Sequence, residues 1–195
     1  MDNADDFNYH FRSMRKRAVF LDRDGVITAN VLRDGRPVAP RTQADFRLLP
    51  GAVEAVARLR KAGFLAVVVT NQPDVRTGHI EPEVMEAMHA DLRRWTGVDD
   101  IRCCVHVDAD GCLCRKPKPG MLTAAAAERG IDLAASYMVG DRWRDVAAGR
   151  AAGCRTVLVD TGYVEEREEV ADATVGSLAE AAEWILRHEA TADAE

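Results

Sequence analysis

Residues 18–30, AVFLDRDGVITAN, run from four apolar residues directly into two aspartates and a glycine. The apolar run at 18–21 is typical of a strand that is buried on both faces, as in the middle of a parallel sheet. Asp22 and Asp24 follow this strand, one residue apart. Two carboxylates so close together repel each other unless a positive charge offsets the repulsion. The stretch therefore predicts a buried strand that ends in a site for a cation.

Strands and helices alternate along the rest of the chain. Further strand-like apolar runs are LAVVVTN, YMVGD and TVLVD, at residues 65–71, 137–141 and 156–160. Helical patterns cover residues 50–64, 81–97, 119–130, 144–154 and 177–190. This alternation predicts an α/β fold, a three-layer Rossmann-like arrangement in which helices cover both faces of a central parallel sheet.

The length and composition fit one globular domain. A chain of 195 residues suits a single domain, and 47% hydrophobic residues are enough to build its core. We expect this domain to cover residues 17–190, with flexible tails at 1–16 and 191–195. The N-terminal tail contains Met14, a second candidate start besides Met1.

The charge of the chain limits its partners. A formal net charge of −6 argues against nucleic acid or a membrane as the partner, because both require a basic face. No apolar run approaches the roughly 18 residues that span a bilayer, and the N-terminus lacks the apolar centre of a signal peptide. We therefore expect a cytoplasmic protein that acts on a small molecule. A single domain with an open mouth can work alone, so we also expect a monomer.

Polar side chains follow three of the predicted strands, at the sheet edge where ligands bind in such folds. The set comprises Asp22 and Asp24 after the first strand, Thr70 and Asn71 at the end of the second, and Asp141 at the end of the third. A lone D-x-D-G is most often a turn, but its recurrence with polar groups at other strand ends favours one shared site. We therefore expect these side chains to converge.

The residue types of this set indicate phosphate chemistry assisted by magnesium. Mg²⁺ binds through one or two carboxylates, waters and phosphate oxygens, which makes Asp22 and Asp141 candidate ligands. A carboxylate can attack phosphorus to form an aspartyl-phosphate, while a second carboxyl transfers the protons. Thr70 can donate to a phosphate oxygen, and Lys116 can hold the phosphate as a point charge.

Four motifs, in this order, resemble the signature motifs of the haloacid dehalogenase (HAD) superfamily. They are FLDRDGVI at 20–27, VVVTNQ at 67–72, CRKPKPGM at 114–121 and YMVGDRWRD at 137–145. Their spacing is similar to that of the branch containing histidinol phosphatases and heptose-bisphosphate phosphatases. The resemblance implies a HAD fold with a minimal cap.

The resemblance also implies roles for the matched residues. It makes Asp22 the nucleophile and a Mg²⁺ ligand. It makes Asp24 the general acid and base, whose backbone carbonyl also binds the metal. Asp141 would complete the metal site. Asp145 would hold the groups of this site in place without binding the metal itself. Phosphate or substrate binding falls to Thr70, Asn71, Arg115 and Lys116.

Four of the five cysteines lie close together, and in a cytosolic chain such clustering suggests metal binding before disulfides. Two short chelating pairs, C-x-H and C-x-C, can enclose a tetrahedral Zn²⁺ in a closed structural site. The predicted ligands are Cys104, His106, Cys112 and Cys114, within a zinc loop at residues 103–115. This pattern resembles the zinc loop of the same enzyme branch. We expect Cys103 to point away, Cys154 to lie in the core, and His79, His89 and His188 to lie at the surface.

The mouth of the site is predicted to be lined by residues 28–46 and 71–83. Arg115 is the candidate for binding a distal charged group, because its planar guanidinium can pair with phosphate or carboxylate. The loop after the second strand reads NQPDVRTG at 71–78, whereas the heptose-bisphosphate branch commonly reads NQSGIARG. Asp74 therefore adds a negative charge where that pattern has glycine.

The resulting expectation is a Mg²⁺-dependent phosphomonoesterase with structural Zn²⁺. Its expected substrate is a sugar bisphosphate, foremost D-glycero-D-manno-heptose 1,7-bisphosphate in nucleotide-activated heptose biosynthesis. One alternative is a histidinol-phosphate phosphatase of histidine biosynthesis. The alternative from another class is a catalytically silent, zinc-stabilised binding module. That module predicts the loss of a key catalytic residue, and none of the matched residues is lost.

Overall fold

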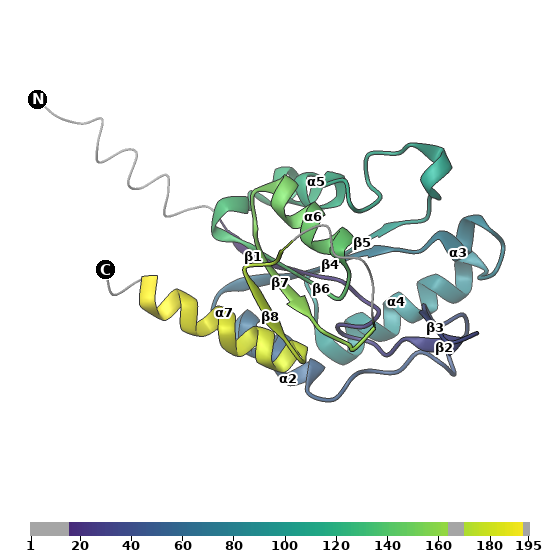
Figure 1. Cartoon of the computed structure of the whole chain (residues 1–195), viewed down its shortest axis with the longest axis horizontal. Coiled ribbons are helices and arrows are strands. Elements are labelled where there is room, and N and C mark those ends of the chain that lie inside the picture. The colour runs from purple at the N-terminus through teal and green to yellow at the C-terminus, as the bar shows by residue number, and fades with distance from the viewer. Residues whose placement is uncertain (1–15, 164–169, 193–195) are drawn as a thin grey trace, which may run out of the picture.

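The computed structural model describes residues 16–163 and 170–192 (Figure 1). Regular structure extends slightly past the expected domain bounds. Lys16 pairs with Ile131 in an isolated bridge, and the last helix continues to Ala192. The remaining residues of both expected tails lie outside the described part of the chain.

A six-stranded parallel sheet forms the middle layer. Its strands are β1 (Arg17–Leu21), β4 (Phe64–Asn71), β5 (Asp100–Cys104), β6 (Tyr137–Gly140), β7 (Arg155–Val159) and β8 (Ala173–Val175). They lie in the order β5-β4-β1-β6-β7-β8, and each neighbouring pair is parallel. The order reverses direction at β1, which places the carboxyl ends of β1, β4 and β6 together.

Helices cover both faces of this sheet, which confirms the predicted three-layer α/β fold (Figure 1). One face carries α2 (Ala52–Lys61), α4 (Pro82–Thr96) and α7 (Leu178–Ala192), and the other carries α5 (Gly120–Arg129) and α6 (Trp143–Ala152). Short helical turns occupy α3 (Pro73–Arg76), η1 (Asp108–Asp110) and η2 (Leu133–Ala135). Within the described residues, no helix combines the length and the apolar character that crossing a membrane requires.

Strand β1 is buried on both faces, as its apolar run predicts. Val19 and Leu21 belong to the core beneath α2 and α7, while Ala18 and Phe20 belong to the core beneath α5. Successive side chains of a strand point to opposite faces, so a central strand needs an apolar residue at every position. The first polar residue after β1, Asp22, therefore emerges at the carboxyl edge of the sheet.

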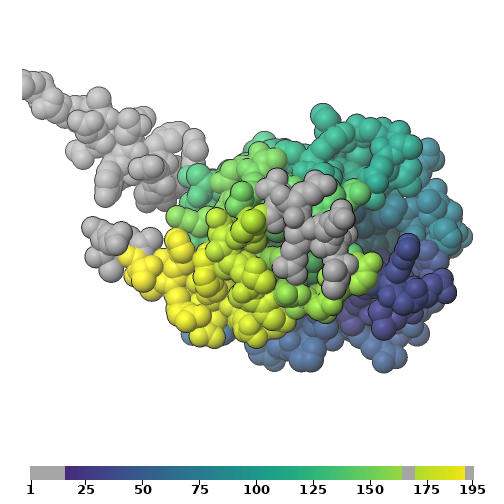
Figure 2. Space-filling view, in the orientation of Figure 1, coloured from purple at the N-terminus to yellow at the C-terminus, as the bar shows by residue number. Residues whose placement is uncertain are grey.

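A small hairpin, not predicted from the sequence, lies beside that edge. It pairs β2 (Val31–Arg33) with β3 (Arg36–Val38). Asp34 and Gly35 form its turn with φ angles of 51° and 72°, the left-handed conformation that Asp-Gly pairs adopt in two-residue hairpins. The hairpin and the predicted zinc loop lie at the same end of the molecule (Figure 2). So small an insertion fits the predicted minimal cap.

Candidate active site

The predicted catalytic residues converge at the carboxyl edge of β1, β4 and β6. A cavity of about 380 Å³ opens there. Its walls include Asp22, Asp24, Thr70, Asn71, Arg115, Lys116 and Asp141. The walls also contain parts of both segments that the sequence places at the mouth, including Asn30 and Asp74. The predicted convergence of these side chains is therefore present in the structure.

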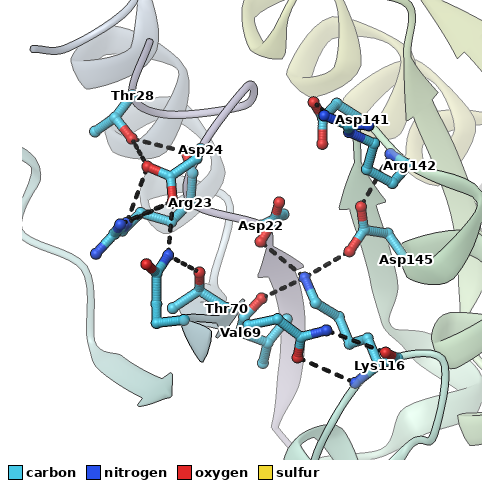
Figure 3. A network of polar contacts seen from close by, with 12 residues as sticks. Asp22, Arg23, Asp24, Thr28, Val69, Thr70, Lys116, Asp141, Arg142 and Asp145 are labelled. Carbon is cyan, nitrogen blue, oxygen red and sulfur yellow. Dashed lines mark hydrogen bonds and ion pairs between the residues drawn. The ribbon is translucent and has the colours of Figure 1, made fainter. Parts of the chain in front are cut away.

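Lys116 lies buried at the centre of the site, between two carboxylates (Figure 3). Its Nζ donates to Oδ1 of Asp22 at 2.7 Å and to the carbonyl of Val69 at 2.8 Å, and it lies 2.5 Å from Oδ1 of Asp145. Burial lowers the pKa of Lys116, but Asp145 and Asp22 outweigh burial and hold this pKa above its ordinary value. Lys116 therefore carries a positive charge next to the predicted nucleophile.

Three carboxylates form a group that suits a hard cation. One oxygen from each of Asp22, Asp141 and Asp145 lies within 4.8 Å of the others. Asp141 presents a buried Oδ1 that has no hydrogen-bond partner within the described residues. Gly25 makes room for this side chain, because a Cβ on Gly25 would lie 2.1 Å from Oδ2 of Asp141. An all-oxygen donor set with an unpaired carboxylate oxygen fits Mg²⁺.

The carboxylates resist ionisation while no cation is bound. Burial raises the pKa of Asp141 to about 8, and the negative charges of Asp22 and Asp145 add to the effect. Burial also raises the pKa of Asp22 to about 6, although Lys116 partly offsets the rise. A bound cation would favour the charged form of both groups and lower both pKa values.

Magnesium is expected to stabilise the protein more at high pH than at low pH. Because the folded-state pKa values of Asp141 and Asp22 lie above the ordinary 3.8, the folded protein holds protons that the unfolded chain releases. The stability from these protons is complete below about pH 4 and is lost as the pH rises toward about 8. Thermal melts with and without Mg²⁺ should show a larger gain in Tm at about pH 8 than at about pH 5.5. Equal gains at both pH values, or a full gain in Asp141→Asn, would contradict this expectation.

Asp24 is held by a buried polar network that the sequence did not reveal (Figure 3). Arg23 is fully buried, and its guanidinium donates to both carboxylate oxygens of Asp24, the NH2–Oδ2 distance being 2.8 Å. The hydroxyl of Thr28 donates to Oδ1 at 2.9 Å, and Nε2 of Gln72 donates to Oδ2 at 2.7 Å. These donors fix the position of the Asp24 carboxylate, and Asp24 lines the same cavity as Asp22.

The prediction that His89 lies at the surface is wrong. His89 is buried on α4, and its Nε2 lies 3.3 Å from NH1 of Arg23. Burial and the charge of Arg23 lower the pKa of His89 to about 4, so the ring stays neutral. The helical spacing contained a signal, because His89 follows Met85 by four residues on the same buried face.

Gln72 and Asn71 position the two predicted phosphate-binding residues, Thr70 and Lys116. Gln72 donates to Oγ1 of Thr70 at 2.8 Å, which leaves the hydroxyl proton of Thr70 free for a phosphate oxygen. Asn71 uses both ends of its amide on the backbone of Lys116, at 3.0 and 3.1 Å. Asn71 thus lines the cavity but fixes the position of Lys116 with the groups that would otherwise bind phosphate.

The predicted zinc ligands form a compact group where β5 ends. The Sγ atoms of Cys104, Cys112 and Cys114 lie 3.2 to 3.7 Å apart. Nδ1 of His106 lies 3.5 Å from Cys104 and 3.3 Å from Cys114. A tetrahedron with Zn–S bonds near 2.3 Å has edges of about 3.8 Å, so the four ligand atoms fit a zinc ion. Cys103 lies outside the group and Cys154 is buried, as expected.

Arg115 joins the zinc loop to the cavity wall. Its Nε donates to Oδ1 of Asp108 at 2.6 Å, and its NH1 donates to the carbonyl of His106 at 3.1 Å. The same aspartate accepts from Arg144 at 3.1 Å. Lys118, by contrast, donates to two backbone carbonyls of the zinc loop and is not part of the cavity wall.

Comparisons with known proteins agree with this geometry. A family model described as HAD-hydrolase-like matches residues 113–181. A curated Pseudomonas aeruginosa protein named D-glycero-β-D-manno-heptose-1,7-bisphosphate 7-phosphatase is 42% identical over 154 residues, which cover 76% of this chain and 84% of that protein. A protein of the same name from Escherichia coli (strain K12) is 37% identical over 191 residues, covering 88% and 95%.

A solved structure shows the same similarity in three dimensions. It is the crystal structure of D,D-heptose 1,7-bisphosphate phosphatase from B. bronchiseptica complexed with magnesium and phosphate. It superposes with a TM-score of 0.74 at 33% sequence identity and covers 88% of this chain and 99% of that chain. The likeness therefore extends over most of this chain and nearly all of that one.

Proposed function

We propose a function from one premise: this chain belongs to the family of HAD-like hydrolases that contains the heptose-bisphosphate phosphatases. On this premise the protein is a Mg²⁺-dependent phosphomonoesterase. Its substrate is D-glycero-β-D-manno-heptose 1,7-bisphosphate, from which it removes the 7-phosphate, as the names of the relatives state for those proteins. The reaction belongs to nucleotide-activated heptose biosynthesis.

The observation that carries this proposal is the position of Lys116 beside Asp22. A buried ammonium group 2.7 Å from a carboxylate oxygen attracts an anionic phosphoryl group to the nucleophile. A silent binding module would have no need of a costly buried cluster of charges. Enzymes maintain such clusters because they stabilise the charge of a transition state.

The chemistry follows from the positions of the two aspartates. Asp22 Oδ attacks phosphorus, the bond between phosphorus and the sugar oxygen breaks, and Asp24 gives a proton to the departing sugar oxygen. Asp24 then takes a proton from a water molecule that attacks the aspartyl-phosphate, which releases phosphate and restores Asp22. Thr70 and Lys116 bind the phosphoryl oxygens throughout. Asp22, Asp141 and the backbone carbonyl of Asp24 would hold Mg²⁺, which neutralises charge on the phosphoryl oxygens when it is bound.

The cysteine group is proposed to hold a structural zinc ion that orders the loop before Arg115 and Lys116. With all four positions filled by protein ligands, such a site has no place for substrate. The zinc would act on catalysis only through the positions of these two cations. The expected monomeric state and cytoplasmic location stay predictions.

Cys112→Ser is expected to lose zinc and stability together, because binding energy at a structural zinc site is also folding energy. We expect the zinc content of the purified protein to fall from about one ion per chain to near zero, with a clear drop in Tm. Elemental analysis and thermal melts measure both. Cys103→Ser is the matched control, since its thiol lies next to the group but outside it. A wild type purified without chelator that contained no zinc would refute the proposed site.

A panel of phosphate esters tests the proposed substrate. Initial rates of phosphate release with Mg²⁺ are measured for both anomers of the heptose bisphosphate, for histidinol phosphate and for hexose phosphates. We expect the highest kcat/KM for the β anomer of the bisphosphate. A preference for histidinol phosphate would instead assign the enzyme to histidine biosynthesis.

A further inference from the structure

We propose that Arg41 is a specificity-determining residue that binds the second phosphate of the substrate, the one that is not removed. This inference rests on the proposed function and adds a residue that none of the four motifs contains. Arg41 lies after β3, in the segment that leads away from the hairpin, and it lines the same cavity as Asp22. It therefore belongs to a cavity wall that the zinc loop does not form.

Asp74 holds the Arg41 side chain in one orientation. Nε of Arg41 donates to Oδ2 of Asp74 at 2.7 Å, and NH2 donates to Oδ1 at 3.2 Å. This two-point contact occupies one edge of the guanidinium and leaves the NH1 group without a hydrogen bond to any described residue. With 27% of its side chain exposed, Arg41 offers an oriented but unused donor to a ligand in the cavity.

Three other cations of the cavity wall contact groups of the phosphoryl site or of the zinc loop. Lys116 contacts Asp22 and Asp145, next to the phosphorus that reacts. Arg115 and Arg144 share the carboxylate of Asp108 in the zinc loop. Arg41 contacts none of these groups, so it is separate from the phosphoryl site at Asp22 and suits a different anionic group of the same substrate.

Asp74 also makes Arg41 necessary for an anionic substrate. A carboxylate in the cavity wall repels phosphate, and the paired guanidinium cancels this charge. Loss of Arg41 would both remove a donor and expose the charge of Asp74. Both effects weaken the binding of a bisphosphate more than that of a monophosphate, because the bisphosphate carries the additional anionic group.

The test compares two substrates that differ only in the second phosphate, the heptose 1,7-bisphosphate and the heptose 7-phosphate. The kcat/KM for the bisphosphate divided by the kcat/KM for the 7-phosphate measures how much the 1-phosphate contributes to substrate recognition. In Arg41→Gln this ratio is expected to fall about ten- to a hundredfold, mainly through a higher KM for the bisphosphate. Arg41→Lys keeps the charge without the planar guanidinium and should recover part of the ratio.

Arg60→Gln is the matched control. Arg60 makes the same two-point contact with Asp99, at 3.1 and 2.9 Å, but it lies on α2 and not in the cavity wall. The ratio of kcat/KM values for the two substrates should be the same in Arg60→Gln as in the wild type. An Arg41→Gln ratio equal to the wild-type ratio, or a wild-type ratio near one, would overturn the role of Arg41 while leaving the phosphatase intact. No turnover of either substrate by the wild type would refute the proposed function itself.

Discussion

Replacing Asp22 with asparagine is expected to abolish turnover, with kcat falling by at least about a thousandfold. An amide of the same shape is not a nucleophile toward phosphorus and provides no anionic oxygen for Mg²⁺. Asp22 lies at the end of the buried strand β1 and accepts from Lys116, so no other described side chain holds the same position. Steady-state phosphate release from the heptose bisphosphate measures the loss.

The folded state of this variant is checked independently of its activity. Asp22 is buried with a raised pKa, so replacing it with a neutral amide removes an unfavourable charge and should not lower Tm. Asp91→Asn, which changes a partly exposed carboxylate on α4 outside the cavity wall, is the control for the substitution itself. Turnover by Asp22→Asn within about tenfold of the wild type would eliminate the aspartyl-phosphate mechanism.

Lys116→Met is expected to reduce both activity and stability. The variant loses the cation that binds the phosphoryl group, so kcat/KM should fall by at least about a hundredfold. It also leaves the buried carboxylates of Asp22 and Asp145 without their shared partner, which costs about 3 kcal/mol or more of unfolding free energy. Urea unfolding and steady-state kinetics measure the two effects.

A second variant separates the two roles of Lys116. In the double variant Lys116→Met/Asp145→Asn, one of the unpaired charges is gone, so part of the stability should return while activity stays low. Lys118→Met is the matched control, because among the described residues the Lys118 ammonium donates to two backbone carbonyls of the zinc loop and to no carboxylate. Wild-type stability in Lys116→Met, or activity restored in the double variant, would contradict the arrangement around Lys116.

The fold and the centre of the site follow from local sequence. Strand β1 is a continuous apolar run because it is buried on both faces, and its polar successors must then lie at the sheet edge. Strands β5 and β8 lack this signal. They are the edge strands of the sheet, so several of their side chains are only partly buried, and short mixed runs such as DIRCC and ATV do not stand out.

Two features of the site depend on tertiary contacts that no local sequence pattern contains. They are the hydrogen-bond network around Asp24 and the ion pair between Arg41 and Asp74 in the cavity wall. An arginine between two aspartates suggests an exposed residue, yet Arg23 is buried against Met85 and His89 of α4. Arg41 meets Asp74 only because the hairpin segment folds beside α3, 33 positions away along the chain. Pairing across such a distance is set by the assembled fold.

The central claim is that this protein removes the 7-phosphate of the heptose bisphosphate with the help of Mg²⁺. Phosphorus-31 NMR follows each phosphate of D-glycero-β-D-manno-heptose 1,7-bisphosphate separately during the reaction with purified protein. The account predicts that the 7-phosphate signal disappears and inorganic phosphate grows only when Mg²⁺ is present, while the 1-phosphate is retained. Loss of the 1-phosphate signal, or an unchanged spectrum with Mg²⁺ present, would contradict it.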